Sequence, residues 1–185
     1  MIEVFGAPGV GKSALCNDLW PPVVPWDGLP LPDHWLAFAS WADRIYIRTE
    51  YSHWRTMFEK ACRKMATLSR APGDGYVGVG LAQRGLDLCW RGCDINTVKE
   101  YCRRMPLPAG LVSLYADQAT IRARNIGRGR HNPYRELSHL AHLNDTPREI
   151  VTDALRKRGV PVLELDTRNE IAGNVDSIRR FLGGS

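Results

Sequence analysis

An apolar segment followed at once by a glycine-rich loop opens the chain, and this feature constrains the fold more than any other. Residues 1–5 are typical of a short buried strand, and residues 6–13 fit the pattern G-x-x-x-x-G-K-[ST] in full. Glycines at this spacing let successive backbone N–H groups turn inward around a phosphate. A helix that begins near Lys12 points the positive end of its dipole at the same place. The segment therefore predicts a strand, a phosphate-binding loop and a helix.

The pattern also predicts roles for individual side chains. Lys12 would bridge the β- and γ-phosphates of a nucleoside triphosphate, and Ser13 would supply a hydroxyl ligand to Mg²⁺. A glycine turn that fits the pattern by chance is the alternative, but its place between a strand and a helix favours phosphate binding. The residues expected to bind the nucleotide here are Gly6, Ala7, Pro8, Gly9, Val10, Gly11, Lys12, Ser13 and Ala14.

Apolar segments and helical periodicities alternate along the rest of the chain. Strands are expected at 1–5, 23–27, 76–80, 111–117 and 160–165. Helices are expected from near Lys12 to 19, at 33–44, 52–70, 81–91 and 96–104, around Ile121, before Arg158 and at 171–182. Strands separated by helices predict an α/β fold, a three-layer αβα sandwich with a central parallel sheet of about five strands.

Length and composition favour one globular domain over residues 1–185. The chain has 185 residues, of which 44% are hydrophobic, enough for one buried core. No apolar run approaches a membrane span of roughly 18 residues, and no signal core follows Met1, so we expect a cytoplasmic protein without a membrane partner. Five cysteines without an export signal predict reduced thiols. The Cys89/Cys93 and His139/His142 pairs are weaker candidates for metal than for ordinary core or surface positions.

The positive charge is carried mostly by arginine, which predicts a phosphate-bearing partner. The net charge is +5, with 20 arginines and 5 lysines, and guanidinium groups match phosphate oxygens in pairs. Five arginines and no acid lie between Gln118 and Arg135, a concentration whose mutual repulsion predicts a lid, at about 124–135, that anions would close. We expect Arg124, Arg128 and Arg130 to act there on the transferred phosphoryl group. A solvated basic loop without a ligand is the alternative.

Three stretches together resemble the P-loop kinases of the nucleoside and nucleotide (thymidylate) kinase type. The first is the phosphate loop. The second is Asp117, a helix with Arg124, and Arg128-Gly129-Arg130, similar to the strand-end acid and lid of that family. The third is residues 162–167, followed by Asn174 and Ile178, similar to the last strand, adenine-side loop and closing helix. The resemblance implies a P-loop NTPase-type fold, ATP and Mg²⁺ as cofactors, and Asp166 and Thr167 beside the adenine.

The chain departs from this family after the third expected strand. Gly80-Leu81-Ala82-Gln83-Arg84 matches a common helix start, but Gly78 and Val79 stand where acids are usual. We expect Asp27, at the carboxyl end of the strand 23–27, to act instead as general base, with a turn or helix-capping role as the alternative. Gln83 and Arg84 would face the phosphate acceptor.

The sequence leaves two classes of phosphate acceptor possible, DNA and a small molecule. Arginines and Lys64 alternate with aromatic residues in the region expected to hold the acceptor, as in sites that bind single-stranded nucleic acid, although most of these rings suit a core equally well. The basic residues are Arg44, Arg48, Arg55, Arg63 and Lys64, and the rings are Trp41, Tyr46, Tyr51 and Trp54.

A narrower resemblance, to phage kinases that phosphorylate 5-hydroxymethyluracil in DNA, makes that base the favoured acceptor and the host cytoplasm the expected location. A free deoxynucleoside or nucleoside monophosphate is the alternative. Two other function classes remain. One is an NTPase or switch module in which Asp117 holds the metal, and the other is a DNA-binding protein that senses nucleotide. Oligomeric state and the choice between ATP and GTP are not predicted.

Overall fold

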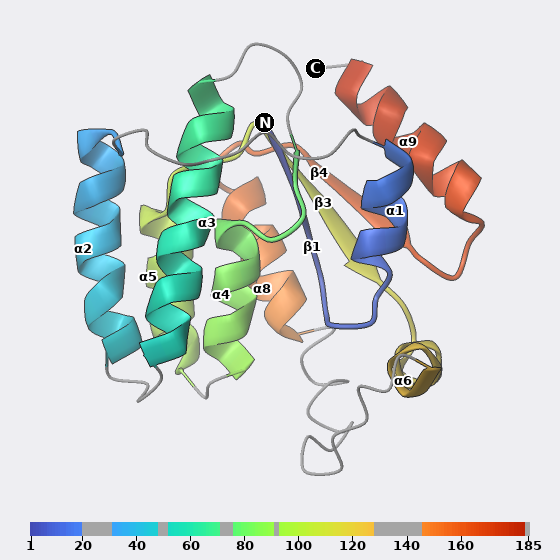
Figure 1. The fold of residues 1–185 in the computed structure, drawn as a ribbon, viewed down its shortest axis with the longest axis horizontal. Helices are drawn as coiled ribbons and strands as arrows, with labels where there is room; N and C mark the ends of the chain where they lie inside the picture. Colours follow the sequence, from blue (N-terminus) through green and yellow to red (C-terminus); the bar gives the residue numbers. More distant parts are fainter. Residues whose placement is uncertain (20–30, 48–51, 71–75, 91–92, 128–145, 184–185) are drawn as a thin grey trace.

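The computed structural model describes residues 1–19, 31–47, 52–70, 76–90, 93–127 and 146–183. Within them a parallel sheet of four strands runs in the order β2-β1-β3-β4 (Figure 1). The strands are β1 (Ile2–Phe5), β2 (Tyr76–Val77), β3 (Gly110–Tyr115) and β4 (Val162–Asp166). The fifth strand expected at 23–27 lies outside the described residues, so the sheet described here has four strands where about five are expected.

The helices follow the sequence prediction closely. They are α1 (Lys12–Leu19), α2 (Asp33–Ile47), α3 (Ser52–Arg70), α4 (Leu81–Trp90), α5 (Ile95–Arg104), α6 (Gln118–Gly127), α8 (Thr146–Arg156) and α9 (Ile171–Gly183). Of the lid expected at 124–135, residues 124–127 are the last turn of α6, and the rest lies outside the described residues.

Strand register places all carboxyl ends at one edge of the sheet. Ile2 is paired with Tyr76 on one side and with Gly110 on the other, and Leu111 is paired with Val162. In an open parallel sheet ligands bind at this edge, outside the ends of the strands. The phosphate loop follows β1 there, so the fold places it where the architecture binds ligands.

The strand expected at 76–80 is shorter than predicted and ends at Val77. The N–H of Gly80 donates to the carboxylate of Glu3, 3.1 Å away, and so leaves the strand ladder. A Cβ on Gly80 would lie 2.7 Å from both Glu3 Cδ and Met65 Sδ, so this close approach requires glycine. The chain therefore turns from β2 into α4 within three residues.

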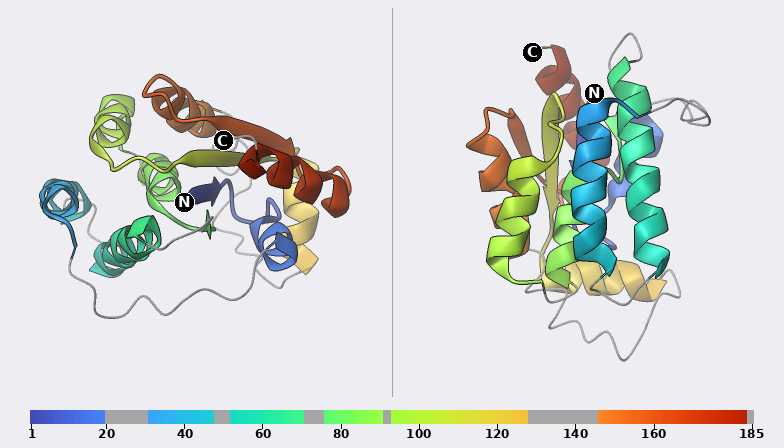
Figure 2. Two further views of the ribbon diagram at one scale, coloured as in Figure 1. Left: turned by 90° about the horizontal axis from the view of Figure 1, so that it is seen from above. Right: turned by 90° about the vertical axis from the view of Figure 1, so that its left-hand side faces the viewer.

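Helices cover both faces of the sheet and complete three layers (Figure 2). Alternate side chains of β1 serve opposite faces, because successive strand residues point in opposite directions. Phe5 belongs to the apolar cluster shared with α2, α3, α4, α5 and α8, whereas Val4 belongs to the cluster shared with α1, α6 and α9. A sheet buried on both faces explains why its strands read as nearly continuous apolar runs.

The cysteines behave as the sequence predicts: all five are free thiols. Burial raises the pKa of Cys62 and Cys102 to about 12, so both remain neutral thiols inside the core. Among the described residues no group of three or more potential ligands is placed to hold a metal ion. None of the helices in this part of the chain has the length and apolar character needed to cross a membrane.

Candidate active site

The phosphate loop has the backbone geometry that its glycines predict. Gly9 and Gly11 have φ angles of +86° and +111°, in the region that glycine alone adopts without strain. A Cβ on Gly9 would lie 2.6 Å from Asn125 Oδ1. The loop is therefore closed over by α6, and residue 9 has no room for a side chain.

Lys12 points its ammonium group back into the loop. Its Nζ donates to the carbonyl oxygen of Gly6 and, at 3.1 Å, to that of Ala7. An ammonium held by loop carbonyls can exchange them for phosphate oxygens without moving far. The position supports the predicted contact of Lys12 with the terminal phosphates of a nucleotide.

Ser13 lies exposed on the first turn of α1, next to Lys12. One hydroxyl at the rim of a phosphate loop fits a magnesium ion, because Mg²⁺ keeps several waters and binds through one or two protein ligands plus substrate phosphates. The contact of Ser13 with this ion stays a prediction from the sequence pattern.

Arg124 joins the phosphate loop to the connection after β4. Its Nη1 donates to the carbonyl oxygen of Val10 at 3.0 Å and to Thr167 Oγ1 at 2.9 Å, and its Nη2 donates to the Thr167 carbonyl at 2.6 Å. Asn125, which the sequence reading did not select, donates to the carbonyl of Pro8 at 3.3 Å. The structure therefore brings together Arg124, predicted to act on the transferred phosphoryl group, and Thr167, predicted beside the adenine.

The acids at the ends of β3 and β4 share one arginine. Arg168 contacts the carboxylates of Asp117, at 3.1 Å, and of Asp166. Asp117 also caps α6 by accepting the N–H of Thr120 at 2.7 Å. These hydrogen bonds hold the pKa of both carboxyls below the usual range. Asp117 therefore acts as a helix cap and ion-pair partner in this structure, and Asp166 lies next to Thr167.

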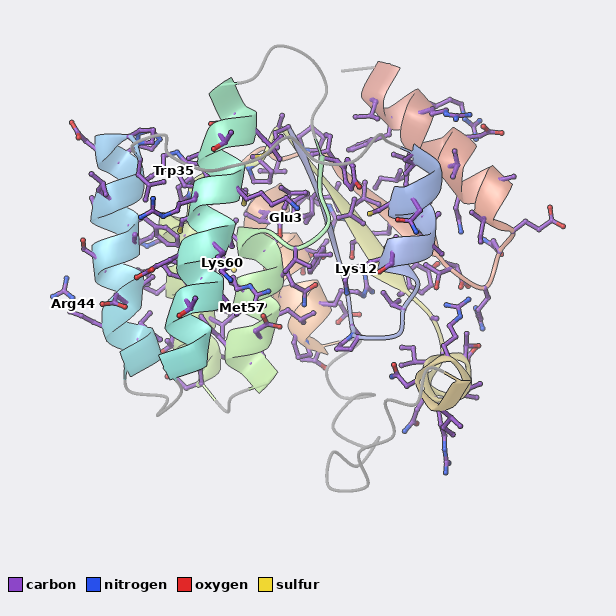
Figure 3. The ribbon with its side chains drawn as sticks, viewed as in Figure 1. Glu3, Lys12, Trp35, Arg44, Met57 and Lys60 are labelled. Atoms are coloured by element: carbon purple, nitrogen blue, oxygen red, sulfur yellow. The ribbon has the colours of Figure 1, made fainter. Side chains whose placement is uncertain are left out.

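Glu3 holds the start of α4 from inside the sheet (Figure 3). Its carboxylate is fully buried and accepts the N–H groups of Gly80, Ala82 and Gln83 at 3.1, 2.9 and 2.9 Å. Burial raises the pKa of Glu3 to about 7, although the three N–H groups favour its charged form. Glu3 is not among the residues predicted from the sequence. A single acid inside an apolar strand is the sequence feature by which it could have been found.

Gln83 and Arg84 are both buried, at 5% and 4% exposure. Gln83 Oε1 accepts the N–H of Gly6 at 3.1 Å, and Gln83 Nε2 donates to Asp87 Oδ1 at 3.3 Å. Arg84 forms an ion pair with Asp87 at 2.6 Å. Their polar groups thus contact protein here, and their predicted contact with an acceptor would require these partners to be exchanged.

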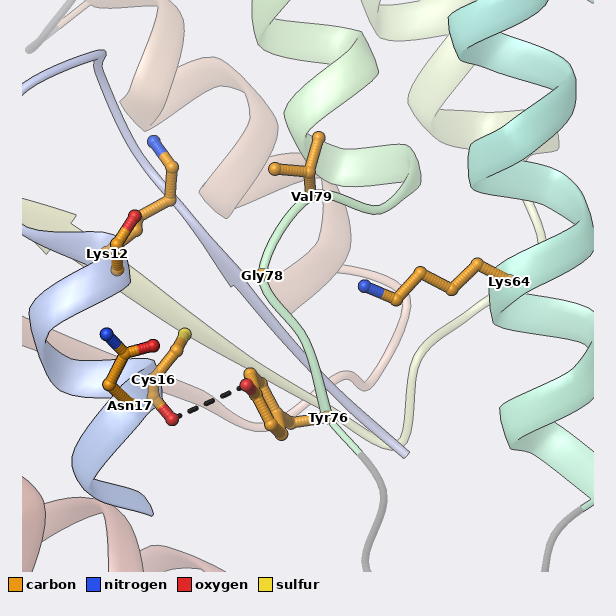
Figure 4. A pocket seen from close by; sticks show the side chains of 8 residues that line it. Lys12, Cys16, Asn17, Lys64, Tyr76, Gly78 and Val79 are labelled. Carbon is orange, nitrogen blue, oxygen red and sulfur yellow. Dashed lines mark hydrogen bonds between the residues drawn. The ribbon is translucent and has the colours of Figure 1, made fainter. Parts of the chain in front are cut away.

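A cavity of about 230 Å³ opens beside Lys12 and Ser13 (Figure 4). It lies between α1 and the turn after β2, and Lys64 reaches it from α3. Gly78 and Val79, which replace the acids usual at this position, form part of its wall. The remaining wall residues are Cys16, Asn17 and Tyr76.

Several predicted residues are not placed. Asp27, Arg48, Arg128 and Arg130 lie outside the described residues, as does the side chain of Arg55. Their expected roles stay predictions.

The basic and aromatic strip predicted on α2 and α3 is partly described. Arg44 and Arg63 are exposed, and Arg44 points away from the protein in Figure 3. Trp41 packs against the apolar core, with the guanidinium of Arg104 4.9 Å from its ring. The Trp41 ring is therefore part of the packing, which is the alternative to base stacking given in the sequence analysis.

No family model and no curated protein matches the chain in sequence. Among solved structures, the fold is similar to that of deoxyadenosine kinase from M. mycoides with the products dCMP and a flexible dCDP bound. The identity is 13%, the TM-score is 0.58, and the match covers 100% of this chain and 99% of that one. The same kinase with bound dATP matches at 13% identity and a TM-score of 0.53, over 98% of both chains. The helix-rich α/β fold with its parallel sheet is thus similar to the fold of this deoxyadenosine kinase.

Proposed function

We propose that the protein is an ATP-dependent kinase that transfers the γ-phosphoryl group to a hydroxyl of a free deoxynucleoside. The observation that carries this proposal is the cavity that opens directly at Lys12 and Ser13, the residues expected at the terminal phosphates. A phosphate loop alone serves many reactions, but a cavity at its catalytic lysine gives an acceptor a place to bind. The fold shared with deoxyadenosine kinase supports the same class of acceptor.

In the proposed step, the bond between the γ-phosphorus and its bridging oxygen breaks, and that oxygen leaves with ADP. A new bond forms between the γ-phosphorus and the acceptor hydroxyl oxygen, whose proton is released. Lys12 stabilises the charge on the phosphate oxygens, since charge develops there during transfer. Magnesium, when bound with the nucleotide at Ser13, neutralises further phosphate charge.

The donor nucleotide would lie on the side of the loop that α6 closes. Arg124 and Thr167 connect the loop to the end of β4, and Asp166 is adjacent. We assign the adenine side to Asp166 and Thr167, and a catalytic role to Arg124, Arg128 and Arg130 on the basis of the sequence pattern. Asp27 remains the proposed general base, because the described wall of the cavity carries no carboxylate.

A small acceptor fits the site better than a base within DNA. The cavity is bounded by α1, α3 and the turn before α4, and the similar structures are nucleoside kinases. The DNA acceptor favoured by the sequence pattern has no support in these comparisons. The wall of the cavity that the structure describes offers no stacking ring other than Tyr76, which donates its hydroxyl to the carbonyl of Cys16.

The proposal is tested by transfer of label from γ-labelled ATP to a panel of acceptors. The panel holds the four deoxynucleosides, their monophosphates, unmodified DNA and DNA that contains 5-hydroxymethyluracil. Labelled deoxynucleoside monophosphate, abolished in Lys12→Met, is the expected result. Label on the modified DNA alone would favour the DNA kinase instead. Release of labelled phosphate that no acceptor changes would favour an NTPase.

A further inference from the structure

We propose that Lys64 is the cation that binds the newly transferred phosphate on the acceptor side, so that the cavity binds a deoxynucleoside monophosphate through Lys64. This assignment rests on the proposed function and names a residue that neither the phosphate loop nor the lid pattern includes. The ligand chemistry is a phosphate monoester attached to the acceptor.

The position of Lys64 on α3 is the first observation. Phe58, Cys62 and Met65 of the same helix are buried in the core, which fixes the orientation of α3 against β2 and α4. Lys64 extends from this anchored helix toward Gly78 and into the cavity, across from α1 (Figure 4). Its ammonium group therefore faces the space next to Lys12 and Ser13 and does not extend into bulk solvent as a surface lysine does.

The second observation is that the described part of the protein provides little to stabilise the positive charge of Lys64. Among the residues that the structure describes, the cavity wall holds no carboxylate, and no hydrogen bond or ion pair reaches the Lys64 ammonium. Partial burial lowers the pKa of Lys64 because it removes water from the charged form. A desolvated cation is costly unless an anion compensates it, and a bound phosphate provides that anion.

The other ionisable groups on the wall do not supply negative charge. Burial raises the pKa of Cys16 to about 11, and it also raises the pKa of Tyr76, so both stay neutral at physiological pH. The charged groups on the described wall are thus Lys12 and Lys64, both positive. A site with this balance favours an anionic occupant over a neutral one.

Lys64 and the proposed donor site lie on opposite sides of the phosphate loop. Arg124 and Thr167 contact the loop from α6 and the end of β4, whereas α3 lies on the other side of α1 and β1 (Figure 1). Lys12 stands between the two sides. During transfer the phosphoryl group moves away from ADP toward the acceptor, so a cation on the far side interacts best once the group has moved.

The experiment measures binding without catalysis, by calorimetry on the full chain. The ligands are dAMP, dCMP, deoxyadenosine, inorganic phosphate and ATP with Mg²⁺. The variants are Lys64→Met, Lys64→Arg and the control Lys60→Met, which lies one turn away on α3, exposed to solvent (Figure 3).

We expect Lys64→Met to weaken dAMP and dCMP binding by roughly ten- to a hundredfold, the range of a lost charge-assisted hydrogen bond. Affinities for deoxyadenosine and ATP should stay within about twofold of wild type. Lys64→Arg should restore monophosphate binding in part, and Lys60→Met should change nothing. The inorganic phosphate arm shows whether the anion alone is sufficient or the nucleoside must be attached.

Unchanged monophosphate affinity in Lys64→Met overturns the assignment, as does a wild-type protein that binds neither monophosphate. An equal loss of deoxyadenosine binding would indicate a change of cavity shape, and a selective loss of ATP binding would place Lys64 on the donor side. Either result also refutes the proposal. Failure of the proposed function is a separate result, namely absence of label transfer to every deoxynucleoside, and it leaves the calorimetric comparison interpretable.

Discussion

The side-chain oxygen of Gln83 accepts a hydrogen bond from the backbone N–H of Gly6, 3.1 Å away and 77 residues earlier in the chain. Gly6 is the first residue of the phosphate loop, and Gln83 lies in the first turn of α4, which Glu3 caps from β1. The loop that would bind the donor is therefore joined through one buried amide to α4, the helix that follows the turn in the cavity wall. A change at the start of α4 is transmitted to the loop by direct contact.

Replacing Gln83 by methionine should weaken ATP binding and lower stability together. The change keeps side-chain length but removes the partner of a buried N–H, which costs about 1–3 kcal/mol. We expect a lower midpoint of denaturant unfolding and roughly tenfold weaker ATP binding by calorimetry, because the loop loses its anchor. Asn96→Ala, at an exposed site on α5, serves as the control. Unaltered ATP affinity in a destabilised Gln83→Met would show that the contact stabilises the fold alone.

Glu3 should make stability fall as the pH rises from about 4.5 to about 7. Burial raises its pKa from 4.5 to about 7, so the folded protein binds this proton more tightly than the unfolded chain does. The stabilisation is complete below pH 4.5, is lost progressively up to pH 7, and adds no slope above it. Over 2.5 pH units the linkage amounts to about 3 kcal/mol at most.

The measurement compares urea unfolding of wild type and Glu3→Gln between pH 4.5 and 8. The difference in unfolding free energy should decline through this window, because glutamine does not titrate. Glu100→Gln is the control, since Arg103 and Arg104 lower the pKa of this carboxyl from 4.5 to about 2. Its contribution to stability therefore rises with pH up to about 4.5 and levels off above that, the opposite sign to Glu3. Parallel profiles for wild type and Glu3→Gln would contradict the buried, proton-binding state.

Gly9→Ala should lose stability through two separable effects. Its φ of +86° strains any residue with a Cβ, and the added carbon would lie 2.6 Å from Asn125 Oδ1. We expect a loss of about 1–3 kcal/mol, of which the steric part is recovered when Asn125→Ala is combined with it. Gly173→Ala is the matched control in α9, where nothing lies within 4 Å and alanine should stabilise slightly. Additive effects in the double-variant cycle would refute the contact between α6 and the loop.

Arg124→Met should weaken ATP binding about tenfold and leave deoxynucleoside binding unchanged. The guanidinium bridges Val10 and Thr167 in a partly buried position, and losing such a charge-assisted hydrogen bond costs about 1.5–3 kcal/mol at most. Arg122→Met, exposed on the same helix, controls for the loss of positive charge. Calorimetry with ATP and with deoxyadenosine separates the two sides of the site. Equal effects of both variants would mean that Arg124 contributes through long-range charge alone.

The sequence by itself determined the local structure of this protein. The glycine pattern at 6–13 predicts the loop, and apolar runs predict the four strands that the structure describes. Helical periodicity places α3 at 52–70, as observed. These features depend on neighbours in the chain, where glycine freedom, side-chain periodicity and prolines act over a few residues. At β2, where the observed bound differs from the predicted one, a distant residue is involved. β2 ends earlier than predicted because the Glu3 carboxylate binds the backbone N–H of Gly80.

Only the tertiary structure decided which polar groups are buried and which face the site. Gln83 and Arg84 follow a pattern that predicts contact with an acceptor, yet Glu3 binds the start of α4 so that both side chains face the protein interior. Asp117 is paired with Arg168, 51 residues away, and Lys64 lines the cavity beside Lys12 from another helix. The free-energy cost of burying a polar or charged group depends on the partners that packing brings next to it. These partners are often far away in the sequence, so the sequence pattern around a residue does not show which partner it will have.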